Sequence, residues 1–440
     1  MTVRNWNDTA RCDPARVATP TRLEELQAIV TDAGRHPSPL RAAGSLHSLT
    51  PCFTTTGTLV SMRGFDAIGE PAAGAVTVGA GVRMIDLRNA LRHRGLQIPV
   101  TPEIGNATAG SVACCGTKDA SLAGGPGQIS AAVTGVKWVD AAGQRQQATQ
   151  ATDPDRLRVM RSSYGLLGVV YEVTFRTCPL QRLRYRYEWL DLDAALTADR
   201  VLGGADGCLA FFLPFHGKVL AERRTLDATA TVGPVDLLKL EIRNLAWKSG
   251  GRPLSDLPEA FDHSLQLFAD PVLMGHFDAV RVDTMIDFLP GGRRFFDFTF
   301  WAFPRTKWST VVPAYVEFCA GFRDRTGFRP NLPTEVYLIN RDAPGEGSLL
   351  SFAHDREVFT LDLVHTVPGP DGATWDRMNV EFNDFAAAHE GRPLLNQTKQ
   401  LGHGVVVQTL GSDWTRFAAL RATADPTGRF LSPFFADLLP

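Results

Sequence analysis

The sequence predicts an α+β fold in two parts of different character. Through about residue 180, helix-like and strand-like segments alternate, and no predicted strand leads into the GxGxxG turn of a Rossmann fold. From about residue 181 to 390, aromatic-rich segments alternate in polarity, which is typical of an antiparallel sheet with one face on helices and one face available to a ligand. At 440 residues the chain is too long for a single core, so two domains are expected.

The first part contains two predicted amphipathic helices. Residues 20–33 repeat apolar side chains on one helical face, and Thr21 with Glu24 forms a predicted capping box at the start. Residues 83–94 repeat the same spacing. Strands are predicted at the apolar or alternating runs 58–62, 76–81, 133–139 and 163–175.

The second part is dominated by predicted strands, at 182–190, 208–213, 294–301, 335–339 and 358–364. Side chains alternate between the two faces of a strand, so Glu335, Tyr337 and Ile339 are expected on one face of the sheet. Asp362 and Val364 share a face of their own strand for the same reason.

Charge and cysteine content exclude several classes of protein. The net charge of −2 gives no electrostatic reason to bind nucleic acid or an anionic membrane. The N-terminus has no apolar signal-like core and the chain has no long uncharged apolar run, so we expect a cytoplasmic protein without a membrane span. The 7 cysteines lack the spacing of a zinc site, so buried free thiols are expected and no metal.

Two segments are rich in small residues. In the loop 41–48, Gly44 and the serines allow the backbone to wrap an anion with its N–H groups, and a neutral imidazole at His47 is nucleophilic near pH 7. The segment 110–127 lets the chain pass close to a large flat ligand. The alternatives are a Gly-Ser turn with a surface histidine and a long surface loop, and the residues alone leave both open.

The order and spacing of the segments 41–48, 107–139 and 163–175 resemble the FAD-binding (PCMH-type) domain of the vanillyl-alcohol oxidase superfamily. Within this superfamily, the chain most resembles the branch of alditol oxidases, aldonolactone oxidases and decaprenylphosphoryl-ribose oxidase. The C-terminal stretches 391–399, 414–421 and 425–430 resemble the signature of these oxidases. The resemblance implies an FAD-binding domain of two α/β subdomains over 1–180, a substrate domain with a large antiparallel sheet over 181–390, and a segment 391–440 that returns to the FAD domain.

The resemblance also implies a set of residues that hold FAD. His47 matches the histidine that many members bond covalently to the flavin 8α-methyl group. Some relatives use a second flavin bond through a cysteine, but this chain has Pro102 and Glu103 at the matching place, so a second bond is not expected. The expected FAD contacts are Arg41, Ala42, Ala43, Gly44, Ser45, Leu46, His47, Ser48, Gly110, Ser111, Cys114, Gly116, Thr117, Ser121, Gly168, Val169 and Lys399.

Four residues are candidates for the chemistry. Lys399 matches the family's active-site lysine, which would stabilise the charge that the reduced flavin gains. Glu335 matches a glutamate near the reacting carbon, and Tyr337 lies on the same strand face. Glu103 is particular to this chain and would be a base beside the flavin. A solvent-exposed lysine and solvent-exposed glutamates are the alternatives.

Three residues depart from the alditol oxidase pattern. The resemblance aligns these residues, Phe298, Tyr337 and Val364, with a glutamine, an arginine and a threonine of alditol oxidases. In those enzymes the three positions bind the polyol. A hydroxyl-rich substrate would leave donors unpaired here, at roughly 1–3 kcal/mol each, so a less polar alcohol is expected. Asp362 could orient a donor group of that substrate.

The leading hypothesis is an FAD-dependent oxidase that converts a CH–OH group to a carbonyl and returns electrons to O₂ as peroxide. A dehydrogenase of the same fold with a non-oxygen acceptor, and a redox-neutral flavoprotein for epimerisation or cyclisation, are the alternatives. A sugar-binding module is a weaker interpretation, because it gives the glycine-rich segments no role.

Overall fold

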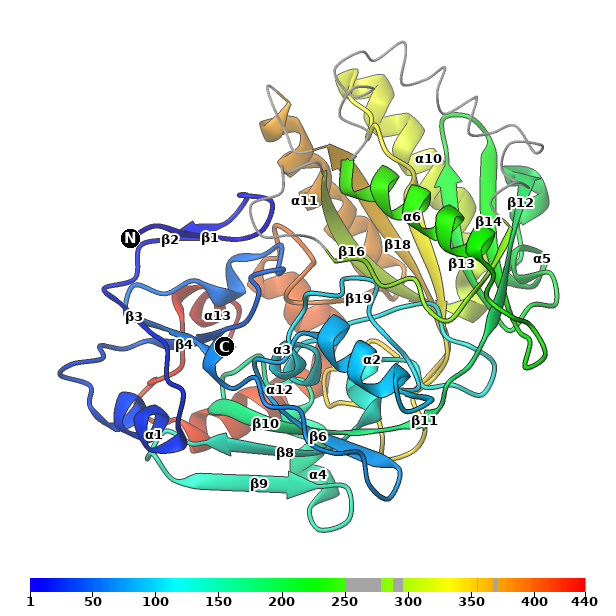
Figure 1. Ribbon diagram of the computed structural model, residues 1–440. Helices are drawn as coiled ribbons and strands as arrows, with labels where there is room; N and C mark the ends of the chain where they lie inside the picture. Colours follow the sequence, from blue (N-terminus) through cyan, green and yellow to red (C-terminus); the bar gives the residue numbers. More distant parts are fainter. Residues whose placement is uncertain (250–277, 288–295, 354, 367–370, 440) are drawn as a thin grey trace.

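The computed structural model describes residues 1–249, 278–287, 296–353, 355–366 and 371–439. Two parts lie side by side in Figure 1, and the N-terminal part is drawn in blue and cyan. The middle of the chain forms the other part around one large sheet, and the last helices, over residues 403–438 and drawn in deeper orange and red, return to the first part. The α+β prediction with a large antiparallel sheet is confirmed.

The N-terminal part contains two main sheets. A parallel three-stranded sheet has the order β3-β5-β4, and an antiparallel four-stranded sheet has the order β6-β10-β8-β9. Its strands are β1 Val3–Arg4, β2 Arg11–Cys12, β3 Arg16–Ala18, β4 Leu40–Ala43, β5 Thr58–Ser61, β6 Ala75–Gly79, β7 Leu96–Gln97, β8 Val133–Val139, β9 Arg145–Thr149, β10 Val169–Arg176 and β11 Cys178–Pro179. Its helices are α1 Leu23–Thr31, η1 Pro51–Phe53, η2 Met62–Gly64, α2 Met84–Arg92, α3 Ala109–Cys114, η3 Ile129–Ala132 and α4 Pro154–Met160.

Helix α1 begins differently from its prediction. Its N-cap residue is Arg22, whose side chain makes no capping hydrogen bond. The backbone N–H of Thr21 donates to Glu25 Oε2 at 2.9 Å, and the Thr21 hydroxyl donates to the same oxygen. The predicted capping box with Glu24 is therefore wrong, because the carboxylate that reaches back belongs to Glu25.

The middle part is an eight-stranded antiparallel sheet with the order β15-β12-β14-β13-β17-β18-β16-β19. Its strands are β12 Leu183–Asp191, β13 Gly207–Leu213, β14 Lys218–Leu226, β15 Ala279–Arg281, β16 Phe296–Pro304, β17 Thr334–Ile339, β18 Val358–Thr366 and β19 Arg392–Pro393. Its helices are η4 Leu192–Ala195, α5 Ala198–Leu202, α6 Pro234–Ser249, η5 Arg305–Lys307, α10 Trp308–Thr326 and α11 Gly372–Ala388. The predicted strand 294–301 matches β16, although residues 294 and 295 lie outside the described residues.

The two faces of this sheet pack on different neighbours. On β17, Val336 and Leu338 belong to the core shared with α10 and α11, which cover that face in Figure 1. Tyr337 and Ile339 belong to a second core that includes Ala120 from the N-terminal part. Alternation along the strand therefore turns Tyr337 toward the N-terminal part.

The C-terminal segment forms α12 His403–Ala424 and α13 Pro433–Leu438. Its Trp414, Phe417 and Phe435 lie in the same hydrophobic core as Val136 of β8 and Val173 of β10. The end of the chain thus packs on the N-terminal part, while the exact boundaries at 180 and 390 stay predictions.

Candidate active site

A cavity lies between the N-terminal part and the face of the eight-stranded sheet that carries Glu335 and Tyr337. Both glycine-rich segments and the ends of β16 and β17 line it. The lining includes Arg41, Ala42, Ala43, Gly44, Ser45, Leu46, His47, Ser48, Pro102, Glu103, Gly110, Ser111, Cys114, Thr117, Lys118, Tyr164, Gly165, Gly168, Ile286, Phe296, Phe298, Glu335, Tyr337, Asn396 and Gln397. The structure therefore brings most of the predicted site residues together.

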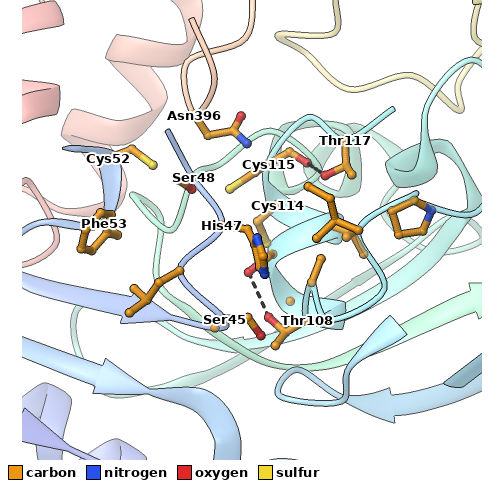
Figure 2. Close-up of a pocket in the computed structure, with 18 of the residues that line it drawn as sticks. Ser45, His47, Ser48, Cys52, Phe53, Thr108, Cys114, Cys115, Thr117 and Asn396 are labelled. Atoms are coloured by element: carbon orange, nitrogen blue, oxygen red, sulfur yellow. Dashed lines mark hydrogen bonds between the residues drawn. The ribbon is translucent and has the colours of Figure 1, made fainter. Parts of the chain in front are cut away.

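The loop after β4 approaches α3 closely. A Cβ atom on Gly44 would lie 2.1 Å from Thr108 Oγ1, so only glycine fits between this loop and the start of α3. Leu46 has a left-handed backbone with φ of 58°, which is uncommon for a side chain of this size and typical of functional loops. These two features constrain the backbone that leads into His47, which Figure 2 shows among Ser45, Thr108 and Cys114.

His47 is neutral at physiological pH. Burial lowers the pKa of its imidazole to about 4, and a side-chain hydrogen bond with Asn106 opposes this only in part. The ring lies 5.8 Å from the Trp6 ring, centroid to centroid. A neutral imidazole keeps a lone pair on one ring nitrogen, so His47 can act as a nucleophile.

The segment around α3 forms the opposite wall. A Cβ on Gly110 would lie 2.9 Å from Ala80 Cβ, which keeps α3 close to β6. Gly168 has φ of 139°, and a Cβ there would lie 2.5 Å from the carbonyl oxygen of Val139. Glycine at these positions therefore lets α3 lie close to the end of β6 and lets the start of β10 lie close to β8.

Four predicted FAD contacts do not line the cavity: Lys399, which is described below, and a glycine, a serine and a valine. Gly116 packs against Leu394, and a Cβ on Gly116 would lie 2.1 Å from Leu394 Cδ1. The Ser121 hydroxyl donates to the Pro126 carbonyl at 3.0 Å. Val169 is fully buried in the core, because it follows Gly168 and points to the other face of β10.

Arg41 joins three segments around the cavity. Its guanidinium, which is 3% exposed, donates to the carbonyl oxygens of Cys52, Tyr164 and Phe430 at 2.8, 2.6 and 3.2 Å. Its Cζ lies 5.1 Å from the centroid of the Phe435 ring. Burial lowers the pKa of this group, and all three hydrogen-bond acceptors are uncharged.

Two carboxyl groups meet at the sheet side of the cavity. The Tyr337 hydroxyl lies 2.9 Å from Glu335 Oε2 and 3.4 Å from Glu103 Oε2. Burial, together with the charge of Glu103, raises the pKa of Glu335 to about 8. Burial, and next the charge of Glu335, raise the pKa of Tyr337, so its hydroxyl stays protonated. This arrangement can hold or accept a proton at neutral pH.

Aromatic and aliphatic groups form the adjoining wall. Phe296 and Phe298 line the cavity with ring centroids 6.3 Å apart, and Ile286 lies on the same wall. The Trp6 ring lies 5.0 Å from Phe296, so it contacts both this wall and His47. Val364 is buried opposite Phe298 in the sheet and does not line the cavity, contrary to its prediction as a substrate contact.

The structure places Lys399 away from the cavity. Its ammonium forms an ion pair with Asp297, a fully buried carboxylate that also accepts hydrogen bonds from Trp375 Nε1 and Asn7 Nδ2. Asn396 and Gln397 line the cavity instead. The prediction that Lys399 touches flavin and substrate therefore does not match this geometry, because its charge is already neutralised within the sheet.

Lys118 is a cation of the cavity that the sequence prediction missed. Its Nζ lies 2.5 Å from Asp362 Oδ2 and 3.8 Å from the centroid of the Tyr337 ring. Asp362 is fully buried beneath it and does not line the cavity, so it contacts Lys118 rather than a substrate. A charged residue in the middle of the apolar run 358–364 was the available signal, since a buried carboxylate needs a cation.

Comparisons with known proteins agree with this geometry. Residues 14–149 match the model of an FAD binding domain, and residues 256–438 match that of D-arabinono-1,4-lactone oxidase. The chain is 25% identical to L-gulono-1,4-lactone dehydrogenase of Mycobacterium tuberculosis over 450 residues, which cover 99% of this chain and 98% of that protein. The predicted resemblance to the vanillyl-alcohol oxidase superfamily, nearest its aldonolactone oxidase branch, is confirmed.

One further relative and one solved structure are consistent with this result. D-Arabinono-1,4-lactone oxidase of Candida albicans is 25% identical over 207 residues, which cover 43% of this chain and 37% of that protein. A solvent-stable cholesterol oxidase has the same fold, with a TM-score of 0.78, 20% identity and coverage of 99% of this chain and 97% of that one. The PCMH-type fold prediction is confirmed.

The residues present fit the FAD of this superfamily. The matched FAD binding domain contains the His47 loop and α3, which come together at the cavity. Gly44 cannot carry a Cβ there, and Arg41 supplies a buried positive charge at the cavity wall. FAD is therefore the cofactor of this oxidoreductase. Among the described residues, no helix has both the length and the apolar character needed to cross a bilayer.

Proposed function

We propose that this protein oxidises a CH–OH group of a small molecule to a carbonyl, with FAD bonded to His47 and O₂ as the final electron acceptor. The observation that carries the proposal is a single cavity with a neutral imidazole on one wall and the Glu335–Tyr337–Glu103 group on another. When bound, FAD would accept the hydride from the substrate carbon and pass two electrons to O₂, which gives H₂O₂.

The residues of the chain account for the proton. As the C–H bond breaks, the hydride carries away two electrons, and the C–O bond becomes C=O when the hydroxyl releases its proton. Glu335 faces the cavity and would take that proton as a carboxylate. Tyr337 donates to Glu335 and would orient its carboxyl group.

The substrate is proposed to be an uncharged alcohol that is less polar than an alditol. Relatives that act on aldonolactones by their names suggest a compact ring as a starting point. The wall of Phe296, Phe298 and Ile286 offers no hydrogen-bond partner to an extended row of hydroxyls. Each hydroxyl buried there without a partner would cost about 1–3 kcal/mol.

A dehydrogenase with another acceptor is the second candidate. It is favoured by the relative that matches nearly the whole chain, which is named a dehydrogenase. One experiment separates the two functions and tests the proposal. Purified protein is mixed anaerobically with a panel of lactones and alcohols, and loss of the oxidised flavin absorbance is recorded. We expect bleaching by at least one compound and peroxide release in air. Bleaching without peroxide would support the dehydrogenase, and no bleaching by any alcohol or lactone would contradict both.

The covalent bond through His47 has its own test. After acid precipitation, we expect the yellow colour of wild-type protein to stay in the pellet, because a bond from the imidazole to the 8α carbon survives unfolding. His47→Ala is expected to release all its FAD to the supernatant. His36→Ala is the matched control, since His36 does not line the cavity. Release of all flavin from the wild-type pellet would contradict the covalent bond.

A further inference from the structure

Two carboxylates face each other across neighbouring strands at the edge of the cavity. Glu335 on β17 is the direct partner of Asp362 on β18 in the antiparallel register. Directly opposite residues share a face of the sheet, and like charges in such a pair repel. Asp362 is fully buried, so water cannot screen this repulsion. The repulsion is relieved by a cation near both groups or by a proton on one of them.

Lys118 supplies that cation from the loop after α3. Its side chain is 8% exposed, and its ammonium contacts Asp362 at 2.5 Å. The same ammonium lies 3.8 Å above the Tyr337 ring, where a cation interacts favourably with the aromatic face. Lys118 also lines the cavity, so its charge acts on groups that would meet a ligand.

Tyr337 contacts this cation through its ring and the two carboxyl groups through its hydroxyl. The hydroxyl has one hydrogen to donate, yet it lies 2.9 Å from Glu335 and 3.4 Å from Glu103. One proton held on either carboxyl group would let both contacts be hydrogen bonds, because a protonated carboxyl donates to the phenol oxygen. Glu335, Tyr337 and Glu103 therefore form a chain that can share one proton.

We propose that Lys118 is the cation that acts on the Glu335–Tyr337–Glu103 group, as a positioning residue for Tyr337 and Glu335. Its part in turnover rests on the proposed function, whereas its effect on the carboxyl groups does not. The positive charge stabilises the carboxylate form of Glu335 and so prepares it to accept a proton. Asp362 has the opposite effect, because its negative charge favours the protonated form.

The charged and titratable groups around Glu335 come from several elements. Glu103 precedes α3, Lys118 follows it, and Asp362 lies on β18. Asp119 acts on Tyr337 from further away and is paired with Arg224 at 2.9 Å. Burial and Glu103 raise the proton affinity of Glu335, and among these groups Lys118 is the cation that lowers it.

Two substitutions should therefore shift the titration of Glu335 in opposite directions. Lys118→Met removes the positive charge and is expected to raise the titration midpoint by about one pH unit. Asp362→Asn removes the negative charge, leaves the lysine in place, and is expected to lower the midpoint. Lys118→Arg keeps the charge and should keep the midpoint near the wild-type value. A general loosening of the fold would not give shifts of opposite sign.

The midpoint is read without turnover, by infrared spectroscopy of the oxidised holoenzyme. The carbonyl stretch of a protonated carboxyl group is followed against pH and assigned by its loss in Glu335→Gln. Lys399→Met is the matched control, because it removes a second buried lysine whose partner is Asp297. This control should leave the midpoint unchanged. If Lys118→Met does not fold, Lys118→Gln is measured in its place.

Shifts of equal sign in the Lys118 and Asp362 variants, or an unchanged midpoint in both, would overturn the proposal. A shift in the Lys399 control as large as that in Lys118→Met would also overturn it. If the midpoints shift as expected but no alcohol or lactone bleaches the flavin, the proposed function fails while the role of Lys118 stands. If an alcohol bleaches the flavin and the midpoints do not move, Lys118 alone is excluded.

Discussion

Glu335→Gln is expected to slow flavin reduction by about 10²–10⁴-fold while FAD remains bound, because removal of a general base typically costs this much. Glutamine keeps the size and accepts the hydrogen bond from Tyr337, but it cannot take the proton of the substrate hydroxyl. The rate is measured by stopped-flow mixing under anaerobic conditions with the compound that bleaches the wild-type flavin.

The pH dependence of the same step gives a sharper result. Glu335 must be unprotonated to accept a proton, and its raised pKa of about 8 means that the carboxylate forms only as pH rises through that value. The wild-type rate should therefore increase with pH through about 8, and Glu335→Gln should lose this increase.

Glu188→Gln is the control for this pair of measurements, because Glu188 lies on the exposed side of β12 and pairs with Arg223. It should keep the wild-type rate and pH profile. A Glu335→Gln rate within a few-fold of wild type would remove Glu335 from the chemistry.

The sequence predicted the parts of this site that depend on local pattern. Alternation along 335–339 was enough to put Glu335 and Tyr337 on one face, and β17 has this arrangement. The glycine and serine content of 41–48 was enough to predict a loop in close contact with other segments, and Gly44 against Thr108 is such a contact. Both features depend only on residues near one another in the chain.

The pairing of buried charges could not be predicted in this way. Asp297 and Asp362 are carboxylates inside apolar strands, and Lys118 and Lys399 are lysines near the cavity segments. Burial of a carboxylate implies that a cation neutralises it, but not which one. The resemblance assigned the active-site charge to Lys399, whereas the fold pairs Lys399 with Asp297 and Lys118 with Asp362. The choice depends on contacts between residues more than 100 positions apart.

The second large effect is expected from Arg41→Met. The substitution leaves the carbonyls of Cys52, Tyr164 and Phe430 without their buried donor, at about 1–3 kcal/mol each. It also removes a buried positive charge at the cavity wall, which the pyrophosphate of FAD would neutralise. We therefore expect a lower melting temperature and a smaller stabilisation by added FAD.

Arg161→Met separates these two effects. Arg161 is also buried and donates to the carbonyl oxygens of Val133, Gly345 and Glu346, but it does not line the cavity. Both arginine variants should have a lower melting temperature than the protein without the arginine substitution. The His47→Ala background is used for both, so that FAD can be removed and added back.

Added FAD raises the melting temperature more when it binds the folded state more tightly. The increase should persist in Arg161→Met and shrink in Arg41→Met, because of the two arginines only Arg41 lines the cavity that would hold FAD. Arg41→Lys keeps the charge but cannot reach three carbonyls with one planar group, so it should recover FAD stabilisation more fully than thermal stability. Equal FAD-induced increases in Arg41→Met and Arg161→Met would make Arg41 a purely structural residue.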